Sequence, residues 1–434
     1  MKTIEFKQLD EVLYYKKLEN GLDVYILPKK GFSKTYVTFT TKYGSIDRTF
    51  VPIGETEAVT VPDGIAHFLE HKMFEKEDGD VFQKFSEVGA QANAFTSFTR
   101  TSYLFSATDH IYRSTSTLLD FVQEPYFTPE TVEKEKGIIG QEITMYDDQP
   151  DWRLYFGAIE NMYETHPVKI DIAGTIESID GITADHLYMC YNTFYHPSNM
   201  LLFVVGAVDP IEMMAYVEAN QANKTFKEAT EIDRQFEEEK TEVAVAEKTL
   251  EMDVQKPKVN VGLKSKKVDL QGSDMLKHEL ALQIGLECVY GRASDFYTDV
   301  YEKGLIDETY SFEFSLEKGF GFALIGSDTS DPDLLAKRIK EQLAVAETGE
   351  LFTEEAVERI KRKKIGFFLR ALNSLEFIAN QFTRYRFNEM DLFEVVPTLE
   401  ALTVADVKEA FQAILGEEQQ TVFKILPVKE RDKK

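Results

Sequence analysis

Two histidines and a glutamate stand close together in the segment HFLEH, residues 67–71. Successive residues of an α-helix turn by about 100°, so His67, Glu70 and His71 project from one face of a helix. Both imidazoles can then bind one zinc ion, which in a catalytic site takes three protein ligands and one water. Glu70 is placed to accept a proton from that water and later to deliver it to a leaving amine. The pattern predicts a zinc hydrolase, and a chance pairing in an acid-rich chain is the alternative.

The third zinc ligand must come from another segment, and an internal repeat narrows the choice. Two segments align at a constant offset: YFTPETVEKEKGIIGQE (126–142) and LFTEEAVERIKRKKIGF (351–367). In the first copy, Glu135 and Glu142 are two helical turns apart and share a face. The second copy has Ile360 and Phe367 there, and the second half also lacks HxxEH. This joint loss favours a metal site in the first half over a solvated acidic face, the alternative for the two glutamates.

The segments around HFLEH predict the elements that position it. GLDVYILP and KTYVTFTTKYGS alternate apolar and polar residues, which is typical of an antiparallel sheet. Residues 64–75 and 80–88 have helical apolar spacing, and the following GAQANAFTSFTRTSYLFSAT is strand-like. A long helix is expected after TPE, with Thr128 as its N-cap and Pro129 at its first position.

The order of elements repeats after a charged segment near the middle of the chain. Strands are expected near 246–265, helices near 274–303, two further strands in TYSFEFS and GFALIGS, and then two longer helices. The predicted fold class is α+β, with two homologous domains that are each an antiparallel sheet packed with helices. We expect a zinc-binding domain over 1–222, a charged linker over 223–245 and a second domain over 246–434.

Composition restricts the class of protein. The length of 434 residues suits about two domains of roughly 200 residues each. A formal charge of -26 opposes binding to nucleic acid or to an anionic membrane surface. Cys190 and Cys288 have no CxxC spacing and are expected to be buried, reduced thiols. The most apolar run, MLLFVVGAV, is too short to span a bilayer and the N-terminus lacks an apolar signal core, so a cytoplasmic protein is expected.

At this point the sequence resembles the inverzincins, the zinc endopeptidase family of pitrilysin, insulysin and the mitochondrial processing peptidase β-subunit. Ordered motifs carry the resemblance over nearly the whole chain: GIAHFLEHKMFE, GAQANAFTSFTRTSYLFSAT, VEKEKGIIGQEITMYDDQP, THPVKIDIAGTIESI and FYHPSNMLLFVVGAVDP. The resemblance implies that His67, His71 and Glu142 bind one zinc ion per chain. It also implies that Glu70 is the catalytic base and that Glu135 is a supporting carboxylate, a role that physical chemistry gives to groups orienting metal ligands.

The resemblance further implies how peptide substrates are held. Asn93 and Ala94, in GAQANAFTS, would belong to an edge strand on which an extended peptide adds, and strand addition suits loose sequence preference. The alternative for these two residues is an ordinary strand end with a turn-forming Asn. Family members enclose a chamber that limits substrates to short or unfolded peptides. Half-size bacterial members of about this length assemble as homodimers or as heterodimers with a related subunit.

One motif departs from the family pattern. In family members the second domain usually contributes an Arg followed seven residues later by a Tyr, near REKGLAYS. Here the stretch reads VYEKGLIDETYSFEF, with Tyr301 where the Arg is expected and Tyr310 near the Tyr position. Tyr310 is therefore predicted to donate a hydrogen bond to a developing oxyanion. Its alternative is an aromatic side chain in a half-buried strand.

The sequence is compatible with three functions. The leading hypothesis is a zinc metalloendopeptidase, a processing-type protease of short or unfolded peptides with a Glu general base. The runner-up is a peptide-binding or assembly subunit of a heterodimeric peptidase with little activity alone, which the missing Arg favours. A metal hydrolase of phosphate esters has little support, because there is no Gly-rich phosphate cradle and KRKK at 361–364 is most simply an exposed helix face.

Overall fold

The computed structural model describes residues 1–428, which form two compact units. Each unit draws on three stretches of the chain. Unit 1 contains 1–143, 170–236 and 371–387, and unit 2 contains 144–169, 237–370 and the described residues from 388 onward.

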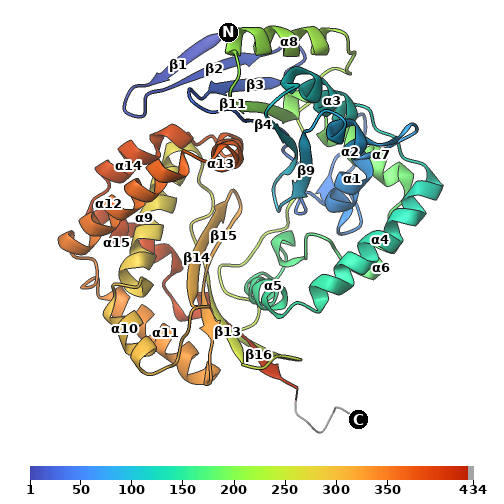
Figure 1. The fold of residues 1–434 in the computed structure, drawn as a ribbon. Helices are drawn as coiled ribbons and strands as arrows, with labels where there is room; N and C mark the ends of the chain where they lie inside the picture. The colour runs from blue at the N-terminus through green and yellow to red at the C-terminus, as the bar shows by residue number, and fades with distance from the viewer. Residues whose placement is uncertain (429–434) are drawn as a thin grey trace. The chain divides into compact units, whose positions relative to one another are not determined.

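The main sheet of unit 1 has seven strands in the order β1-β2-β3-β11-β4-β10-β9 (Figure 1). Their bounds are β1 Lys2–Phe6, β2 Glu11–Lys17, β3 Asp23–Pro28, β4 Thr35–Thr41, β9 Gln91–Thr96, β10 Thr101–Ala107 and β11 Met200–Gly206. The apolar run MLLFVVG forms β11, which is buried along its length, parallel to β3 and antiparallel to β4. Two short hairpins, β5 (Thr49–Phe50) with β6 (Val59–Thr60) and β7 (Glu75–Lys76) with β8 (Gly79–Asp80), complete the strands.

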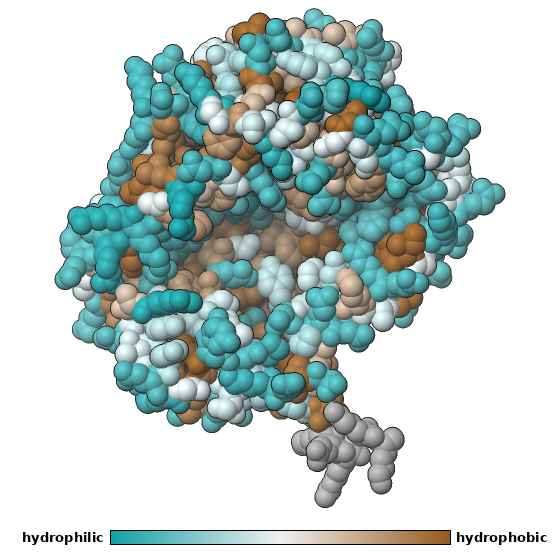
Figure 2. All heavy atoms as spheres, viewed as in Figure 1, coloured by the Kyte–Doolittle hydropathy of each residue, from teal (hydrophilic) through white to brown (hydrophobic). Residues whose placement is uncertain are grey.

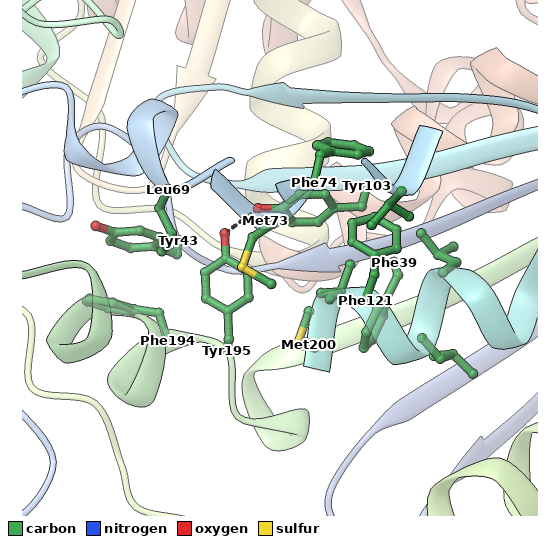
Figure 3. Close-up of a cluster of buried hydrophobic side chains, with 14 of the residues drawn as sticks. Phe39, Tyr43, Leu69, Met73, Phe74, Tyr103, Phe121, Phe194, Tyr195 and Met200 are labelled. Carbon is green, nitrogen blue, oxygen red and sulfur yellow. Dashed lines mark hydrogen bonds between the residues drawn. The ribbon is translucent and has the colours of Figure 1, made fainter. Parts of the chain in front are cut away.

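Helices of unit 1 pack on this sheet. They are α1 Ile65–Met73, α2 Val81–Ser86, α3 Ile111–Gln123, α4 Pro129–Asp147, α6 Ile176–Asp180, α7 Ala184–Phe194, α8 Pro210–Ala222 and α13 Leu375–Phe387. The N-cap expected for α4 is present, since the Thr131 backbone N–H donates to Thr128 Oγ1 at 3.2 Å. Helix α1 turns Leu69 and Met73 into an aromatic core (Figure 3). In that core the Tyr103 and Tyr195 hydroxyls are 2.8 Å apart, so their polar ends are satisfied without water.

Unit 2 repeats the plan with five strands in the order β12-β16-β13-β15-β14. The strands are β12 Glu247–Met252, β13 Lys258–Lys264, β14 Ser311–Glu317, β15 Phe320–Asp328 and β16 Gln420–Pro427, and the helices are α5 Pro150–Met162, α9 Gly272–Tyr290, α10 Asp295–Glu302, α11 Pro332–Glu347, α12 Glu354–Ala371, α14 Val395–Ala401 and α15 Val404–Phe411. Its one parallel pair, β12 with β16, corresponds to β3 with β11 of unit 1. The three antiparallel pairs follow in the same order, which confirms the predicted α+β class with two related halves.

Two helices belong to the unit that their position in the sequence does not predict. Helix α13, from the second half of the chain, packs in unit 1, where Phe382 stacks on Phe203 of β11 at 4.4 Å. Helix α5, from the first half, packs in unit 2, and a Cβ added at Gly157 would lie 2.3 Å from the Phe423 ring of β16. Each helix thus packs in a unit other than the one to which the expected domain limits, residues 222 and 246, would assign it. Apolar faces rather than chain order decide where a helix packs.

The charged segment expected as a linker over 223–245 has defined contacts at both ends. In unit 1, the Val51 N–H donates to the Asp233 carbonyl and Arg234 pairs with the buried Asp47 at 2.8 Å. In unit 2, Glu239 pairs with Lys264 at 2.7 Å. This segment is therefore attached to each unit by specific polar contacts.

Hydrophilic residues dominate the visible surface, as the net charge of -26 leads one to expect (Figure 2). Cys190 is buried as predicted, whereas Cys288 is only half-buried, which corrects the expectation for that thiol. Among the described residues, no helix is both long enough and apolar enough to cross a bilayer.

Candidate metal centre and active site

Helix α1, which carries HFLEH, starts at a tightly packed glycine. Gly64 has a φ of 85°, a left-handed conformation that side chains rarely adopt. A Cβ at Gly64 would lie 2.3 Å from the Ala173 carbonyl oxygen. Ser178 adds a hydrogen bond from its hydroxyl to the Asp63 carbonyl at 2.9 Å. The THPVKIDIAGTIESI motif therefore holds the start of the helix that presents the two histidines.

His67, His71 and Glu142, which the family resemblance implies as ligands, converge in the structure. Glu142 Oε2 lies 3.5 Å from His71 Nε2 and 3.7 Å from His67 Nε2. The candidate donor atoms of these three side chains all lie within 4.8 Å of one another, and no other His, Cys, Asp and Glu group does so within residues 1–428. All three belong to unit 1, with Glu142 supplied by α4.

These separations suit one tetrahedral zinc ion. Two ligand atoms that are each about 2.0–2.1 Å from such an ion lie roughly 3.3 Å from each other. The nitrogen–oxygen distances of 3.5 and 3.7 Å are close to that value. Two imidazoles and one carboxylate are also the donor set of zinc hydrolases that leave a position for water. The residues present therefore fit a catalytic zinc ion.

Burial gives the two histidines opposite behaviour. Burial, together with the neighbouring His71, lowers the pKa of His67 to about 3, so His67 is neutral at pH 7 and free to bind a metal through nitrogen. Burial also opposes the charged form of His71, but the hydrogen bond to Glu135 and the nearby carboxylates of Glu70 and Glu142 outweigh it and raise its pKa. His71 therefore lies in a strongly negative environment that a divalent cation would neutralise.

Glu135 contacts the metal site through His71. Its carboxylate Oε1 lies 3.1 Å from His71 Nδ1, while His71 Nε2 points toward Glu142. An acceptor at Nδ1 holds the proton there and leaves Nε2 as the ligand atom. Glu135 thus lies beside a candidate ligand, and its supporting role remains a prediction.

Glu70 projects from α1 into the same site and is 8% exposed. Burial raises the pKa of Glu70 to about 7, against the opposing effects of a hydrogen bond from Thr96 and of the nearby His71. A carboxyl group with a pKa near neutrality is suited to accept and return a proton at physiological pH.

Thr96 is a site residue that the sequence analysis missed. Its hydroxyl donates to Glu70 Oε2 at 2.6 Å, from the last position of β9. The two residues are 26 positions apart in the chain, and no local spacing relates a strand end to a helix face. The one available signal is that Thr96 follows the NAF segment on which a peptide was expected to bind.

Asn93 and Ala94 lie on β9, which is an edge strand of the seven-stranded sheet. β9 pairs with β10 on one side, and Ala94 is opposite Tyr103 in that register. The Asn93 side chain accepts the Ala94 backbone N–H at 2.9 Å. The strand is therefore at the edge, as expected, and its role toward a peptide remains a prediction.

Tyr310 has contacts that disagree with its predicted role. Its side chain is 8% exposed, and its hydroxyl donates to the Tyr290 carbonyl at 2.8 Å within unit 2. Burial raises the pKa of Tyr310, so its proton is held firmly in that bond. These contacts favour the alternative of an aromatic packing residue, although Tyr310 lies one residue before β14 rather than within a half-buried strand. Tyr301, which replaces the expected Arg, is exposed and stacks on Tyr297.

Comparison with known proteins identifies the family of the chain. A family model described as "Insulinase (Peptidase family M16)" matches residues 48–176, and one described as "Peptidase M16 inactive domain" matches residues 181–364. A protein of Bacillus subtilis (strain 168), named uncharacterized zinc protease YmfH, is 60% identical over 98% of this chain and 99% of its own. The chain belongs to peptidase family M16. The segment that the Insulinase model matches contains HFLEH.

Solved structures agree with this membership. The crystal structure of a putative M16-like peptidase from Alicyclobacillus acidocaldarius has a TM-score of 0.93 and 40% identity, over 96% of this chain and 99% of that one. Pitrilysin shares the fold, with a TM-score of 0.73 and 14% identity, and the match covers 98% of this chain but 46% of pitrilysin. The chain is a half-size M16 member.

Proposed function

We propose that this M16 protein is a zinc-dependent endopeptidase that cleaves short or unfolded peptides. The main support is that His67 Nε2, His71 Nε2 and a Glu142 oxygen converge. The buried Glu70 carboxyl lies on α1, the helix that carries the two histidines. The 60% identical relative named a zinc protease supports the choice of metal. One zinc ion per chain is proposed, bound by His67, His71 and Glu142.

The proposed reaction assigns each residue a task. When bound, zinc would polarise the scissile carbonyl and make a water molecule more acidic. Glu70 takes the proton from that water as it attacks the carbonyl carbon, and afterwards returns the proton to the leaving amine. Glu135 keeps the Nδ1 proton of His71 in place throughout. Tyr310 is left out of this set, because its hydroxyl is already bonded to Tyr290.

The substrate class follows from the edge strand. A peptide added to β9 beside Asn93 and Ala94 would be held by backbone hydrogen bonds, which select extended segments rather than particular side chains. Folded proteins do not offer such segments. We propose that two chains, identical or related, enclose the substrate, and that this enclosure sets the limit on its size.

Substitution of the base tests the proposal. In E70Q, cleavage of a quenched-fluorescence peptide should fall by about 10²–10⁴-fold, because the amide cannot accept the proton from water. Metal analysis should still find one zinc ion per chain, since Glu70 is not among the proposed ligands. Cleavage by E70Q at the native rate would contradict the assignment.

The second candidate is a peptide-binding or assembly subunit with little activity of its own. It is favoured by Tyr301 at the position expected for Arg and by the engaged hydroxyl of Tyr310. Native mass measurement with metal analysis, followed by a peptide-library digest of the same sample, separates the two candidates. A chain that binds zinc yet cleaves no peptide until a related protein is added would support this second function.

A further inference from the structure

The Glu70 carboxylate is attached to a strand by a single hydroxyl. Thr96 Oγ1 donates to Glu70 Oε2 at 2.6 Å, a length typical of a hydroxyl bonded to a carboxylate. Glu70 is otherwise the end of a flexible side chain on α1, while Thr96 closes β9, whose residues 93 and 94 are proposed to hold the peptide. This bond thus joins the proposed base to the proposed substrate strand.

Thr96 is itself held rigidly. It is opposite Thr101 in the β9–β10 register, and the buried Thr101 hydroxyl donates to the Tyr43 carbonyl at 2.9 Å. The turn that follows is closed by Ser97 and Arg100, with the Ser97 N–H donating to the Arg100 carbonyl at 2.8 Å. The Thr96 backbone is therefore fixed by the sheet, and Thr96 Oγ1 also lies 3.4 Å from the Thr101 hydroxyl.

The same turn is anchored to a second loop. A Cβ at Gly44 would lie 2.4 Å from the Phe98 carbonyl, and the Ser45 and Ile46 N–H groups donate to the carbonyls of residues 97 and 98. Contacts this close leave little room for the end of β9 to move relative to the core. A rigid donor bonded to a carboxylate selects one rotamer of that carboxylate.

We propose that Thr96 is a positioning residue, which holds the Glu70 carboxylate in register with a peptide on β9. The proposal rests on the proposed peptidase function and adds a residue to it. Thr96 contacts neither the two histidines nor Glu142 in any hydrogen bond of the structure, so its effect should reach the reaction through Glu70. A misplacement of the base by about 1 Å is enough to cost roughly 100-fold in rate.

Three variants test this role. T96V removes the hydroxyl and keeps the shape, T96S keeps the hydroxyl, and T38V makes the same Thr→Val change at a buried hydroxyl that has no hydrogen-bond partner. We expect T96V to lower kcat by about 10–100-fold with KM within about twofold of native. T96S should recover kcat to within about threefold, and T38V should match the native chain. Zinc content should be unchanged in all three.

Crystal structures provide a measurement that does not depend on activity. In T96V the Glu70 carboxylate should occupy more than one rotamer, whereas T96S should keep the native one. Native kcat in T96V together with an undisturbed Glu70 would overturn the proposal. Loss of zinc, or a rise in KM without a fall in kcat, would also overturn it. If T96V does not fold, T96A replaces it in the same measurements.

Different results would refute the peptidase function and the positioning role of Thr96. A native chain that cleaves no peptide would refute the peptidase assignment, and the Glu70 rotamers of native and T96V crystals would then decide the role of Thr96 alone. An unchanged rotamer in that comparison would refute it.

Discussion

At the scale of single residues, burial and nearby charges shift the pKa values of His67, Glu70 and His71 away from their ordinary values. His67 stays neutral because burial lowers its pKa to about 3, and Glu70 is driven toward neutrality by burial that raises its pKa to about 7. Burial opposes the charged form of His71, but nearby carboxylates, among them Glu135 at 3.1 Å from Nδ1, outweigh it and raise the pKa of His71. The pKa values of His67 and His71 thus shift in opposite directions although both residues lie on one helix.

The contact between Glu135 and His71 makes a prediction about metal affinity. In E135Q, zinc should bind about 10–100-fold more weakly, because the amide cannot hold the Nδ1 proton of His71 as a carboxylate does. Competition with a chromogenic chelator measures this affinity. E130Q, at an exposed glutamate in the first turn of the same helix, is the matched control and should bind zinc as the native chain does. Equal affinities in E135Q and E130Q would contradict the assigned role.

At the scale of elements, the helices that carry the two copies of the repeat have different partners. In unit 1, α4 carries the first copy, and α1 and α4 supply the three converging candidate ligands. In unit 2, α12 carries the second copy, and its Lys363 donates a hydrogen bond to Glu287 of α9. An ion pair between side chains therefore connects α9 to α12, while α1 and α4 can share a metal ion.

A second feature at this scale is the attachment of the charged segment to unit 2. The Glu239 carboxylate accepts the backbone N–H groups of Glu164, Thr165 and His166 at 2.7–3.0 Å, in addition to its bond with Lys264. Burial alone would raise the pKa of Glu239, but the Lys264 ammonium and these N–H groups outweigh it and lower the pKa to about 2 from its ordinary 4.5. The charged form is thus stabilised by folding.

This shift predicts a pH-dependent loss of stability. A lowered folded-state pKa contributes stability that is complete above about pH 4.5 and is lost as the pH falls toward 2. E239Q should therefore be less stable than the native chain by about 1–3 kcal/mol at pH 7, with a smaller difference at pH 3. Urea unfolding at both pH values measures this. E237Q, at an exposed position, is the control, and a difference that does not narrow at pH 3 would contradict the prediction.

At the scale of the whole molecule, one strand plan serves two units with different chemistry. Both have a parallel pair followed by three antiparallel pairs in the same order, but the candidate ligand set lies only in unit 1 among the described residues. A metal ion that binds only the folded state stabilises that state.

Removal of the metal from the site proposed in unit 1 should therefore lower the stability of the fold. At a free zinc concentration of about 100 times Kd, binding contributes about 2.7 kcal/mol, which corresponds to a Tm higher by roughly 5–10 °C. Chelation should remove this increase, and added zinc should restore it, as followed by differential scanning calorimetry. The double variant H67A/H71A is the control and should show no response to zinc. A native chain whose unfolding ignores chelator and zinc would contradict the proposed site.

Features that depend on local spacing could be predicted from the amino-acid sequence. The helical period places His67, Glu70 and His71 on one face, and alternation of apolar and polar residues indicates strands such as β3 and β4. The cap at Thr128 and the loss of Glu135 and Glu142 from the second copy were also readable. Each depends on residues a few positions apart, or on a comparison of the chain with itself.

Features that depend on contacts between residues far apart in the sequence could be seen only in the tertiary structure. It brings Glu142 to both histidines and Glu135 to His71, where spacing alone left the two glutamates equivalent. It also joins Thr96 to Glu70 and buries the Tyr310 hydroxyl against Tyr290. Packing of apolar faces determines which side chains from distant segments meet. The residue pattern of one segment does not identify the segment that packs against it.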